Sequence, residues 1–301
     1  DKLTVSPRNL ASRVRGIHAH SRSATEGHAG QRLAINLAGV EKADVQRGDW
    51  IVGDAAHAPT QRIDARVRVL PQEAKALAHW TPLHLHLGAL DVGARVVLLE
   101  GQAIAPGANA LVQLHLDRPI GALRGDRFIL RDQSALRTLG GGTVIDIFSP
   151  DTRRHKAQRV AALQALEKTT PAEALQAWLA LAPQSGIDLS QFTTLWNLQP
   201  DDVTALLQAV PHRLVVEDKT SLLFAPGQIE RFVERVTERL AAHHAKLPDS
   251  PGLTQEQLQR VVTDKPSGTV FALLLRDLVK SGVLQRTGPH LRLAGHEASL
   301  Q

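Results

Sequence analysis

The sequence predicts a multidomain protein with β structure first and α structure second: two β-barrel domains followed by two winged-helix domains. Up to residue 147, short runs alternate between apolar and polar side chains and are separated by turn residues, a pattern typical of compact barrels. From Arg153 onward, apolar residues instead recur at the spacing of one face of a helix. The change falls at Ser149-Pro150 and divides the chain into its two halves.

The composition is that of an ordinary globular protein. Of 301 residues, 43% are hydrophobic and 22% charged, and the net charge of +5 is too small for a protein that coats nucleic acid indiscriminately. Because the chain has no apolar run of about 18 residues and no signal-peptide start, we expect a cytoplasmic protein without a membrane partner. The absence of cysteine excludes disulfides and thiolate metal sites. Since the chain starts at Asp1 and contains no methionine, we expect a fragment of a longer protein.

The β half is expected to form two domains, residues 1–55 and 56–150, joined where the alternation lapses between Asp54 and Thr60. Two alternating runs in the first domain, Ser12–Ala19 and Arg32–Leu37, predict strands. The second domain contains half a dozen such runs, as expected for a barrel or sandwich. They are Ile63–Leu70, Leu83–Leu87, Ala94–Leu99, Ala110–Leu116, Asp126–Arg131 and a return strand that resumes at Val144-Ile145.

Residues 151–226 are predicted to form the first winged helix. Two helices are indicated by apolar residues three or four positions apart: Val160, Leu163 and Leu166, and then Leu175, Trp178 and Leu179. A further helix should begin after Pro200, because Asp201-Asp202 place acids in its first turn. The strands Arg213–Glu217 and Ser221–Phe224 follow, and helices followed by a hairpin indicate a winged helix.

The same order recurs in residues 227–301, which predicts a second winged helix and an internal repeat of roughly 75 residues. A long amphipathic helix comes first, and Thr254 and Gln257 have the spacing of a capping box that opens the next helix. A third helix, Val270–Lys280, should end at Gly282, since glycine suits the left-handed cap position. The hairpin of Val283–Arg286 and His290–Leu293 completes the unit.

No catalytic residues are predicted. Gly140-Gly141-Gly142 lies between two predicted strands, where it favours a permissive hairpin turn and a close approach of the backbone to another group. It opens no helix, so it is not a dinucleotide fingerprint. Because the chain also lacks a phosphate loop of the G-x-x-x-x-G-K-[S/T] type, we do not expect it to bind GTP in the usual way.

The fourteen histidines do not predict a metal site. His18 with His20, and His84 with His86, each share one face of a predicted strand, but no carboxylate or other third ligand is recognisably placed beside either pair. His243 and His244 are adjacent on a helix and point about 100° apart, which is a poor arrangement for two ligands of one ion. We therefore assign no metal ligands.

Several local strings resemble those of bacterial selenocysteine-specific elongation factors. The predicted order of barrel, barrel, winged helix and winged helix agrees with that resemblance, which covers essentially the whole chain. In the β half the similar strings are Arg13–His20, Ala29–Gly39, Arg47–Ile51, Trp80–His86, Gly93–Leu99, and the run R-D-x-S-x-x-x-T-x-G-G-G-x-V from Arg131 to Val144. In the α half they are His243–Gly252 and Leu291–His296.

The resemblance implies a function in translation. Members of this family are GTPases of the elongation factor Tu type that deliver selenocysteinyl-tRNA to the ribosome at recoded UGA codons. Residues 1–55 and 56–150 would then be the C-terminal part of the domain 2 barrel and the domain 3 barrel, which bind tRNA, and the winged helices would form a connecting arm. The GTPase domain, with its GTP and Mg²⁺, would precede Asp1. The winged helices that bind the messenger's selenocysteine-insertion hairpin would follow Gln301, so this fragment is expected to be non-catalytic.

Five residues are carried over from the family. Arg32 matches a basic residue that lines the selenocysteine pocket, where a fixed cation favours the ionised selenol over a serine hydroxyl. Arg131, Arg137, Thr138 and Gly141 match the region of elongation factor Tu that lies against the acceptor and T stems of tRNA. Helical RNA is recognised there through its shape and backbone, for which arginine beside glycine is suited. Two simpler interpretations are that Arg32 is a surface residue, and that Arg131 is paired with Asp132 or Asp146.

One alternative belongs to another class of protein. The chain could be a non-enzymatic winged-helix regulator or scaffold that binds duplex DNA or protein through residues 151–301, with a β half that serves protein contacts. That alternative predicts no dependence on Arg32. The elongation-factor hypothesis predicts tRNA as the ligand.

Overall fold

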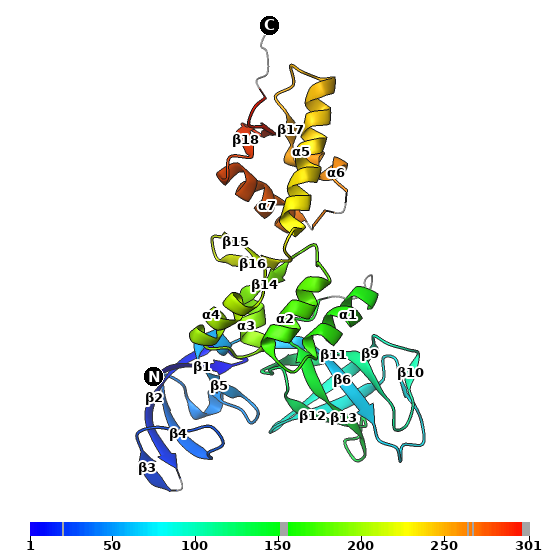
Figure 1. The fold of residues 1–301 in the computed structure, drawn as a ribbon. Helices are drawn as coiled ribbons and strands as arrows, with labels where there is room; N and C mark the ends of the chain where they lie inside the picture. Colours follow the sequence, from blue (N-terminus) through cyan, green and yellow to red (C-terminus); the bar gives the residue numbers. More distant parts are fainter. Residues whose placement is uncertain (20, 151–155, 264, 267, 297–301) are drawn as a thin grey trace. The chain divides into compact units, whose positions relative to one another are not determined.

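The computed structural model describes residues 1–19, 21–150, 156–263, 265–266 and 268–296, and it divides the chain into two compact units (Figure 1). Unit 1 comprises Asp1–Glu167 together with Thr194–Leu198, and unit 2 comprises Lys168–Thr193 together with Gln199–Gln301. Strands dominate the first unit and helices the second, as the sequence predicts. The helix that follows residue 155 is grouped with the β half, so the division does not coincide with the boundary expected at residue 150.

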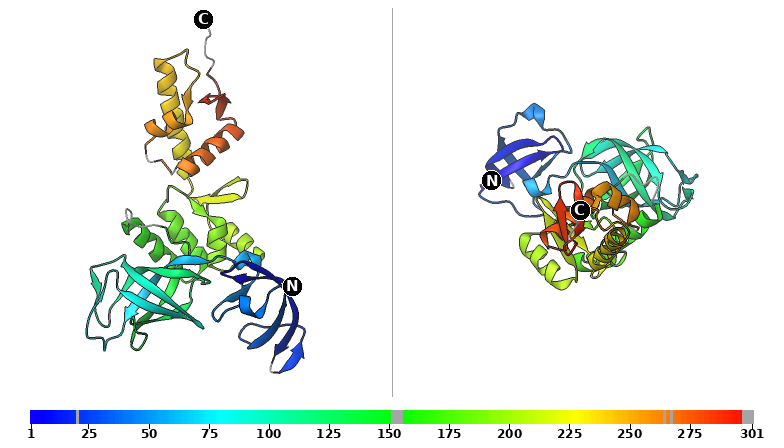
Figure 2. Two further views of the ribbon diagram at one scale, coloured as in Figure 1. Left: turned by 180° about the vertical axis from the view of Figure 1, so that it is seen from behind. Right: turned by 90° about the horizontal axis from the view of Figure 1, so that it is seen from above.

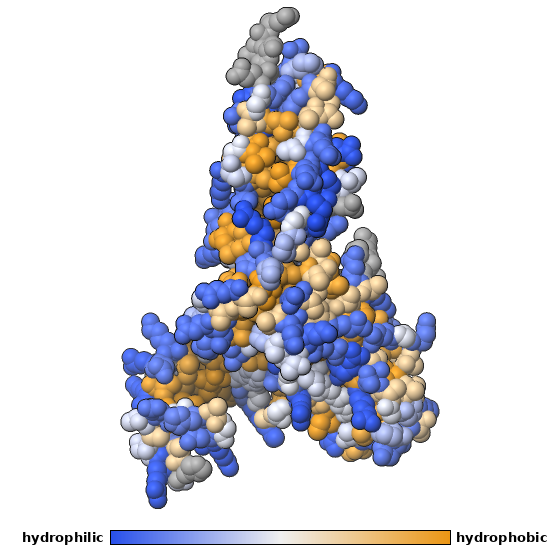
Figure 3. Space-filling model, viewed as in Figure 1, coloured by the Kyte–Doolittle hydropathy of each residue, from blue (hydrophilic) through white to orange (hydrophobic). Residues whose placement is uncertain are grey.

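The N-terminal part of unit 1 is a five-stranded sheet in the order β3-β2-β1-β5, with β4 also paired to β2. Its strands are β1 (Lys2–Ser6), β2 (Leu10–Ala19), β3 (Arg22–Ala24), β4 (Leu33–Ala38) and β5 (Trp50–Val52). The 3₁₀ helices η1 (Lys42–Asp44) and η2 (Asp54–Ala56) flank β5. Val5 is the one large apolar residue of this described sheet that is fully buried. Apolar atoms are visible at the surface in this region in Figure 3.

Residues 60–146 contain a closed six-stranded barrel in the order β11-β6-β13-β12-β8-β9, shown from further directions in Figure 2. Inward-facing side chains such as Ile63, Leu85 and Leu114 have no exposed surface and form its core. The barrel strands are β6 (Thr60–Val69), β8 (Pro82–Leu87), β9 (Leu90–Leu98), β11 (Asn109–Ile120), β12 (Arg127–Arg131) and β13 (Thr138–Asp146). The short strands β7 (Leu77–Ala78) and β10 (Ala103–Ile104) pair with each other.

The three consecutive glycines lie inside strand β13, and the prediction that they form the hairpin turn is wrong. β13 pairs with β12 on one side and with β6 on the other. A Cβ atom would lie 2.2 Å from the carbonyl oxygen of Arg68 at Gly140, and 2.6 Å from that of Phe128 at Gly141. Glycine is therefore required because neighbouring barrel strands approach too closely for a side chain.

Helix α1 (Lys156–Leu166) follows the barrel, and its side chains Leu163 and Leu166 are fully buried. The pattern that predicted a helix from Arg153 is confirmed from Lys156, and residues 153–155 lie outside the described residues. α1 is linked to β6 and β13 by buried polar contacts described below. It therefore belongs structurally to the barrel.

The first helical domain contains α2 (Pro171–Ala180), β14 (Ile187–Asp188), α3 (Leu189–Leu195), α4 (Pro200–Ala209), β15 (Arg213–Glu217) and β16 (Thr220–Phe224). Its strands form a sheet in the order β14-β16-β15. The predicted start of α4 is confirmed, with Pro200 in the first turn and Asp201 and Asp202 beside the free N–H groups. α3 and β14 are additional to the elements predicted from the sequence.

The second helical domain contains α5 (Gln228–Lys246), β17 (Leu253–Thr254), α6 (Gln255–Val261), α7 (Gly268–Lys280), β18 (Leu284–Thr287) and β19 (His290–Leu293). The predicted capping box is confirmed, because the Thr254 hydroxyl accepts a hydrogen bond from the Gln257 N–H. Gly282 has a φ of 77°, as predicted for a left-handed cap. The winged-helix order of helices and strands is thus present twice.

Unit 2 has one continuous apolar core. Val215, Leu222 and Phe224 of the β15–β16 hairpin belong to the same buried cluster as the inward faces of α5 and α7. Beside this core, Glu217 Oε1 of β15 forms an ion pair with Arg276 Nε of α7 at 2.8 Å. The hairpin of the first domain and α7 of the second are therefore packed together.

Candidate nucleic-acid interface

The loop between β12 and β13 is ordered by Asp132. Asp132 Oδ1 accepts hydrogen bonds from the backbone N–H groups of Leu136 and Arg137 at 2.9 and 3.0 Å. Its own N–H donates to the Arg137 carbonyl oxygen at 2.9 Å, and Ala135 completes the loop with a φ of 56°. The backbone hydrogen bond from Arg137 lowers the pKa of Asp132 below its ordinary value. The loop therefore has a defined shape around an ionised carboxylate.

Arg137 extends from this loop toward solvent. Its guanidinium Nη1 lies 3.1 Å from Glu73 Oε2, and its side chain is 58% exposed while that of Glu73 is only 9% exposed. The nearly buried carboxylate thus contacts one side of the guanidinium, while more than half of the Arg137 side chain stays exposed to solvent. Arg137 can therefore contact a phosphate, and losing its ion pair with Glu73 in exchange would cost little because the pair is partly exposed to solvent.

Arg131 and Thr138 lie directly opposite each other at the mouth of the loop, and Arg131 is also opposite His84 on β8. Among the described residues, Arg131 forms no ion pair with Asp132 or with Asp146, the two partners considered from the sequence. Asp132 instead binds the backbone of its own loop, and Asp146 binds Arg159. Arg131 is therefore available on the outer wall of the barrel.

Gly141 lies on the same strand, opposite Ile129 of β12 and Arg68 of β6. Arg131, Arg137, Thr138 and Gly141 thus come together on the β12–β13 hairpin. Ile129 is 51% exposed, so this wall combines arginines with an exposed apolar side chain. Since the barrel itself requires glycine at position 141, a role of Gly141 in tRNA binding stays a prediction.

Arg32 lies elsewhere, immediately before β4 of the N-terminal sheet, and is exposed. A turn precedes it, in which the His28 N–H donates to Gln31 Oε1 at 2.9 Å. Within the described part of the chain, no hydrogen bond or ion pair joins Arg32 to the β12–β13 hairpin. Its assignment to a selenocysteine pocket therefore stays a prediction.

A carboxylate does lie beside His84 and His86, contrary to the sequence prediction. The β8–β9 turn brings Asp91 opposite His86, and Asp91 Oδ1 lies 2.8 Å from His84 Nδ1. The chain spacing alone did not reveal this contact, which depends on the hairpin register. Among the residues that the structure describes, no group of three or more His, Cys, Asp or Glu side chains is arranged to hold a metal ion.

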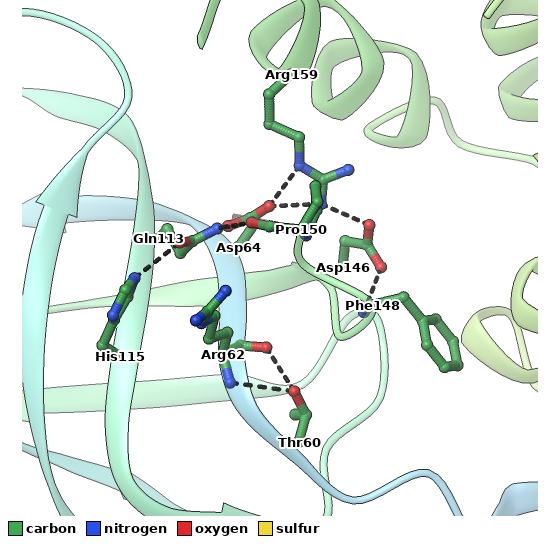
Figure 4. Close-up of polar contacts among 9 residues, drawn as sticks. All are labelled: Thr60, Arg62, Asp64, Gln113, His115, Asp146, Phe148, Pro150 and Arg159. Carbon is green, nitrogen blue, oxygen red and sulfur yellow. Dashed lines mark hydrogen bonds and ion pairs between the residues drawn. The ribbon is translucent and has the colours of Figure 1, made fainter. Parts of the chain in front are cut away.

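A buried polar network fastens α1 to the barrel wall (Figure 4). Arg159 donates from Nε to Asp64 Oδ2 and from Nη2 to Asp146 Oδ2, each at 2.6 Å. Gln113 donates to Asp64 Oδ1 at 3.0 Å and, through Oε1, lies 2.8 Å from His115 Nε2. The network therefore runs from α1 through two barrel strands to a histidine on β11.

Burial governs the charges in this network. It raises the pKa of Asp64, although Arg159 opposes the shift. Burial alone would lower the pKa of Arg159, but the carboxylates of Asp146 and Asp64 raise it. Arg159 is therefore a permanent cation held between two aspartates, and sequence reasoning did not find it.

Comparisons with known proteins bear on the barrel and on the second helical domain. The family model described as "Selenocysteine-specific elongation factor, beta-barrel domain" matches residues 64–151, and "Elongation factor SelB, winged helix" matches residues 237–293. The selenocysteine-specific elongation factor of Escherichia coli (strain K12) is 30% identical over 99% of this chain. That of Desulfomicrobium baculatum is 27% identical over 100% of it. The resemblance to selenocysteine-specific elongation factors is confirmed.

The chain spans about half the length of these relatives, 46% and 48% respectively. A solved structure, "Crystal structure of bacterial selenocysteine-specific elongation factor EF-Sec", matches 97% of this chain and 44% of its own chain with a TM-score of 0.67 and 19% identity. That likeness supports the fold. The barrel and winged-helix architecture predicted from the sequence is therefore confirmed for this chain.

The sequence of this segment has no phosphate loop of the kind that holds GTP and Mg²⁺, the groups that the family implies. No step that involves GTP is therefore assigned to these residues. No helix among the described residues is long and apolar enough to cross a membrane.

Proposed function

We propose that this chain is the segment of a selenocysteine-specific elongation factor that binds selenocysteinyl-tRNA for delivery to the ribosome at recoded UGA codons. The observation that carries the proposal is the β12–β13 hairpin, on which the Asp132 loop presents Arg137 next to Arg131 and Thr138. The exposed Arg137 and the half-buried Arg131 on one hairpin suit the phosphates of an RNA stem. Residues 64–151, which include the hairpin, match the family's barrel domain.

In the proposed function, unit 2 serves as a connecting arm. Arg276 of α7 is paired with Glu217 of β15, and the hairpin of the first domain shares a core with α5 and α7, so the two helical domains are joined as an arm would require. A messenger hairpin, GTP and Mg²⁺ would be bound by other parts of such a factor. Its place of action would be the cytoplasm, where tRNA and ribosomes meet.

The test is binding of this chain to selenocysteine-specific tRNA and to an ordinary elongator tRNA across a salt series. We expect tighter binding of the first, weakening steeply with salt because phosphate contacts release counterions. Arg137→Ala and Arg131→Ala should each weaken binding and reduce the salt slope by about 1. Arg127→Ala is the matched control, since Arg127 is exposed on the same strand but outside the loop.

Arg32→Ala tests the pocket assignment separately. We expect it to weaken binding of selenocysteinyl-tRNA more than that of seryl-tRNA, because a fixed cation favours the ionised selenol. Equal losses for the two tRNAs would refute the pocket. Binding of duplex DNA without binding of either tRNA would instead support a winged-helix regulator and overturn the proposed function.

A further inference from the structure

A second feature of the barrel wall lies away from the β12–β13 loop and is built around Trp80. Trp80 is 48% exposed, and its φ of 64° is a backbone conformation that bulky side chains rarely adopt. The turn between β7 and β8 holds this conformation, since the Trp80 N–H donates to the Val96 carbonyl oxygen at 2.6 Å. A strained backbone that presents a large aromatic ring to solvent is characteristic of a binding site.

An arginine and a histidine lie beside the ring. The Arg95 guanidinium lies 5.6 Å from the Trp80 ring centre, and the His115 ring stands edge-on at 5.6 Å. Arg95, His115 and Arg62 are directly opposite one another on β9, β11 and β6, so they form one row across three strands. We call Trp80, Arg95, His115 and Arg62 the Trp80 platform.

The buried network described above lies beside the platform on the same face of β6 and β11. His115 Nε2 is fixed by Gln113 Oε1, and Gln113 is in turn fixed by Asp64, which binds Arg159. His115 and Arg62 are drawn beside this network in Figure 4. The His115 ring that borders Trp80 therefore has a set orientation before any ligand arrives, which lowers the entropic cost of binding.

The side chains around Trp80 suit a nucleic acid better than a folded protein partner. Arg95, His115 and His79 lie beside Trp80, so polar and cationic side chains border the exposed ring. A folded protein partner usually needs a larger apolar patch around its aromatic anchor. A nucleobase needs only one planar face, and its phosphates need nearby arginines.

We propose that the Trp80 platform binds an unpaired base of single-stranded RNA, with the base stacked on Trp80 and its phosphates at Arg95 and Arg62. The choice of RNA rests on the proposed function in translation. The residues are distinct from Arg32 and from the β12–β13 hairpin, so the site adds a second RNA contact to the barrel. Stacking tolerates any base, so the site should show little sequence preference.

The experiment measures binding of a fluorescein-labelled ten-nucleotide oligouridylate to the chain by anisotropy, in low salt. We expect Trp80→Leu, which keeps apolar bulk but removes the π face, to weaken binding roughly fivefold to a hundredfold. Trp80→Phe should retain part of the affinity. Arg95→Gln should weaken binding and lower the salt slope by about 1, whereas the control Arg118→Gln, on an exposed β11 arginine outside the platform, should do neither.

A thermal melt of Trp80→Gly provides a measurement that does not depend on RNA. Glycine accepts a positive φ without strain but loses the packing of the half-buried ring, so this variant should still melt cooperatively, at a slightly lower temperature than the parent chain, while losing oligouridylate binding. Unchanged binding by Trp80→Leu, or equal affinity for a duplex of the same length, would overturn the platform. A loss of tRNA binding in Arg137→Ala with oligouridylate binding intact would show that the two sites are separate. Failure of either proposal is therefore distinguishable from failure of the other.

Discussion

Arg159 Nη2 lies 2.6 Å from Asp146 Oδ2, and this contact ties helix α1 to the last strand of the barrel. Asp64 binds the same guanidinium from β6, so one arginine joins two strands that are neighbours in the barrel. All three side chains are almost completely buried. The polypeptide that leaves the barrel is thereby held in a fixed position for its first helical turns.

Arg159→Met should destabilise unit 1 by about 3–5 kcal/mol, because it leaves two buried carboxylates without their cation. Native-state hydrogen exchange of β6, β13 and α1 measures the loss. The control is Arg66→Met. Arg66 also joins the barrel to the end of α1, with Nη2 at 2.6 Å from Glu167 Oε2, but this pair is partly exposed. Arg66→Met should therefore lower the free energy of unfolding by about 1 kcal/mol or less. Equal losses for the two variants would contradict the argument.

Such a network could not be predicted from sequence spacing. Asp64 and Arg159 are 95 positions apart, and Gln113 is 49 positions from Asp64. Alternation patterns assign each residue to a face of its own strand, and they do not say which helix covers that face. Asp64 occupies an outward position on β6 that would ordinarily be solvated. It is buried because α1 packs over it.

Gly140→Ala should destabilise the barrel by about 3 kcal/mol, because the added Cβ would meet the Arg68 carbonyl oxygen at 2.2 Å. Backbone cannot move aside as a flexible side chain can. Gly16→Ala is the matched control in another strand, since no described atom beyond its chain neighbours lies within 4 Å of the position of its Cβ. Its cost should stay within about 0.5 kcal/mol. Urea denaturation of both variants measures the difference, and similar midpoints would refute the steric explanation.

The sequence predicted that the backbone at these glycines approaches another group closely. It did not predict that this group is the backbone of the neighbouring barrel strands. Most strands and helices were recovered because their apolar periodicity reflects burial on one side. Local chemistry also sufficed at Thr254 and Gly282, where the cap is decided by residues within one turn. The β8–β9 register that places Asp91 beside His84 needed the turn at Gly88 to be recognised. Arg137 was identified only through the family resemblance, since nothing local distinguishes it from Arg127.

The second helical domain should lose stability as the pH falls below about 6.5, the ordinary pKa of histidine. His244 is 7% exposed and stacks on His296 with ring centres 3.6 Å apart. Burial, together with the nearby His296, His243 and Arg292, lowers the pKa of His244. The unfolded chain therefore takes up a proton at a higher pH than the folded domain. Stability is complete above the unfolded pKa and is lost as the pH falls toward the folded pKa.

Hydrogen exchange at the C-terminal turns of α5, at pH 8 and at about pH 5.5, measures this effect. His244→Phe keeps an aromatic ring against His296 but cannot take up a proton. The variant should therefore lose much of the pH dependence and remain folded. If its exchange rises with acid as steeply as in the parent chain, another group is responsible.

Asp132→Ala should weaken tRNA binding several-fold, although it removes a negative charge next to the proposed RNA contact. Repulsion alone predicts the opposite sign, since an acid close to phosphates lowers affinity. However, Asp132 Oδ1 fixes the N–H groups of Leu136 and Arg137, and without it the loop loses the conformation that presents Arg137. The pKa of Asp132 is lowered by these contacts, so the loop should keep its order at any pH above that value.

Glu73→Gln is the matched variant for this prediction. Glu73 also carries a negative charge next to Arg137, at 3.1 Å, but in the described loop the N–H groups of Leu136 and Arg137 donate to Asp132 and not to Glu73. Its removal releases the guanidinium and should tighten tRNA binding. Opposite signs for the two variants in one salt series would separate loop order from local charge. If both variants tightened binding, Asp132 would act on RNA through its charge alone, and the hairpin would not need its ordered loop.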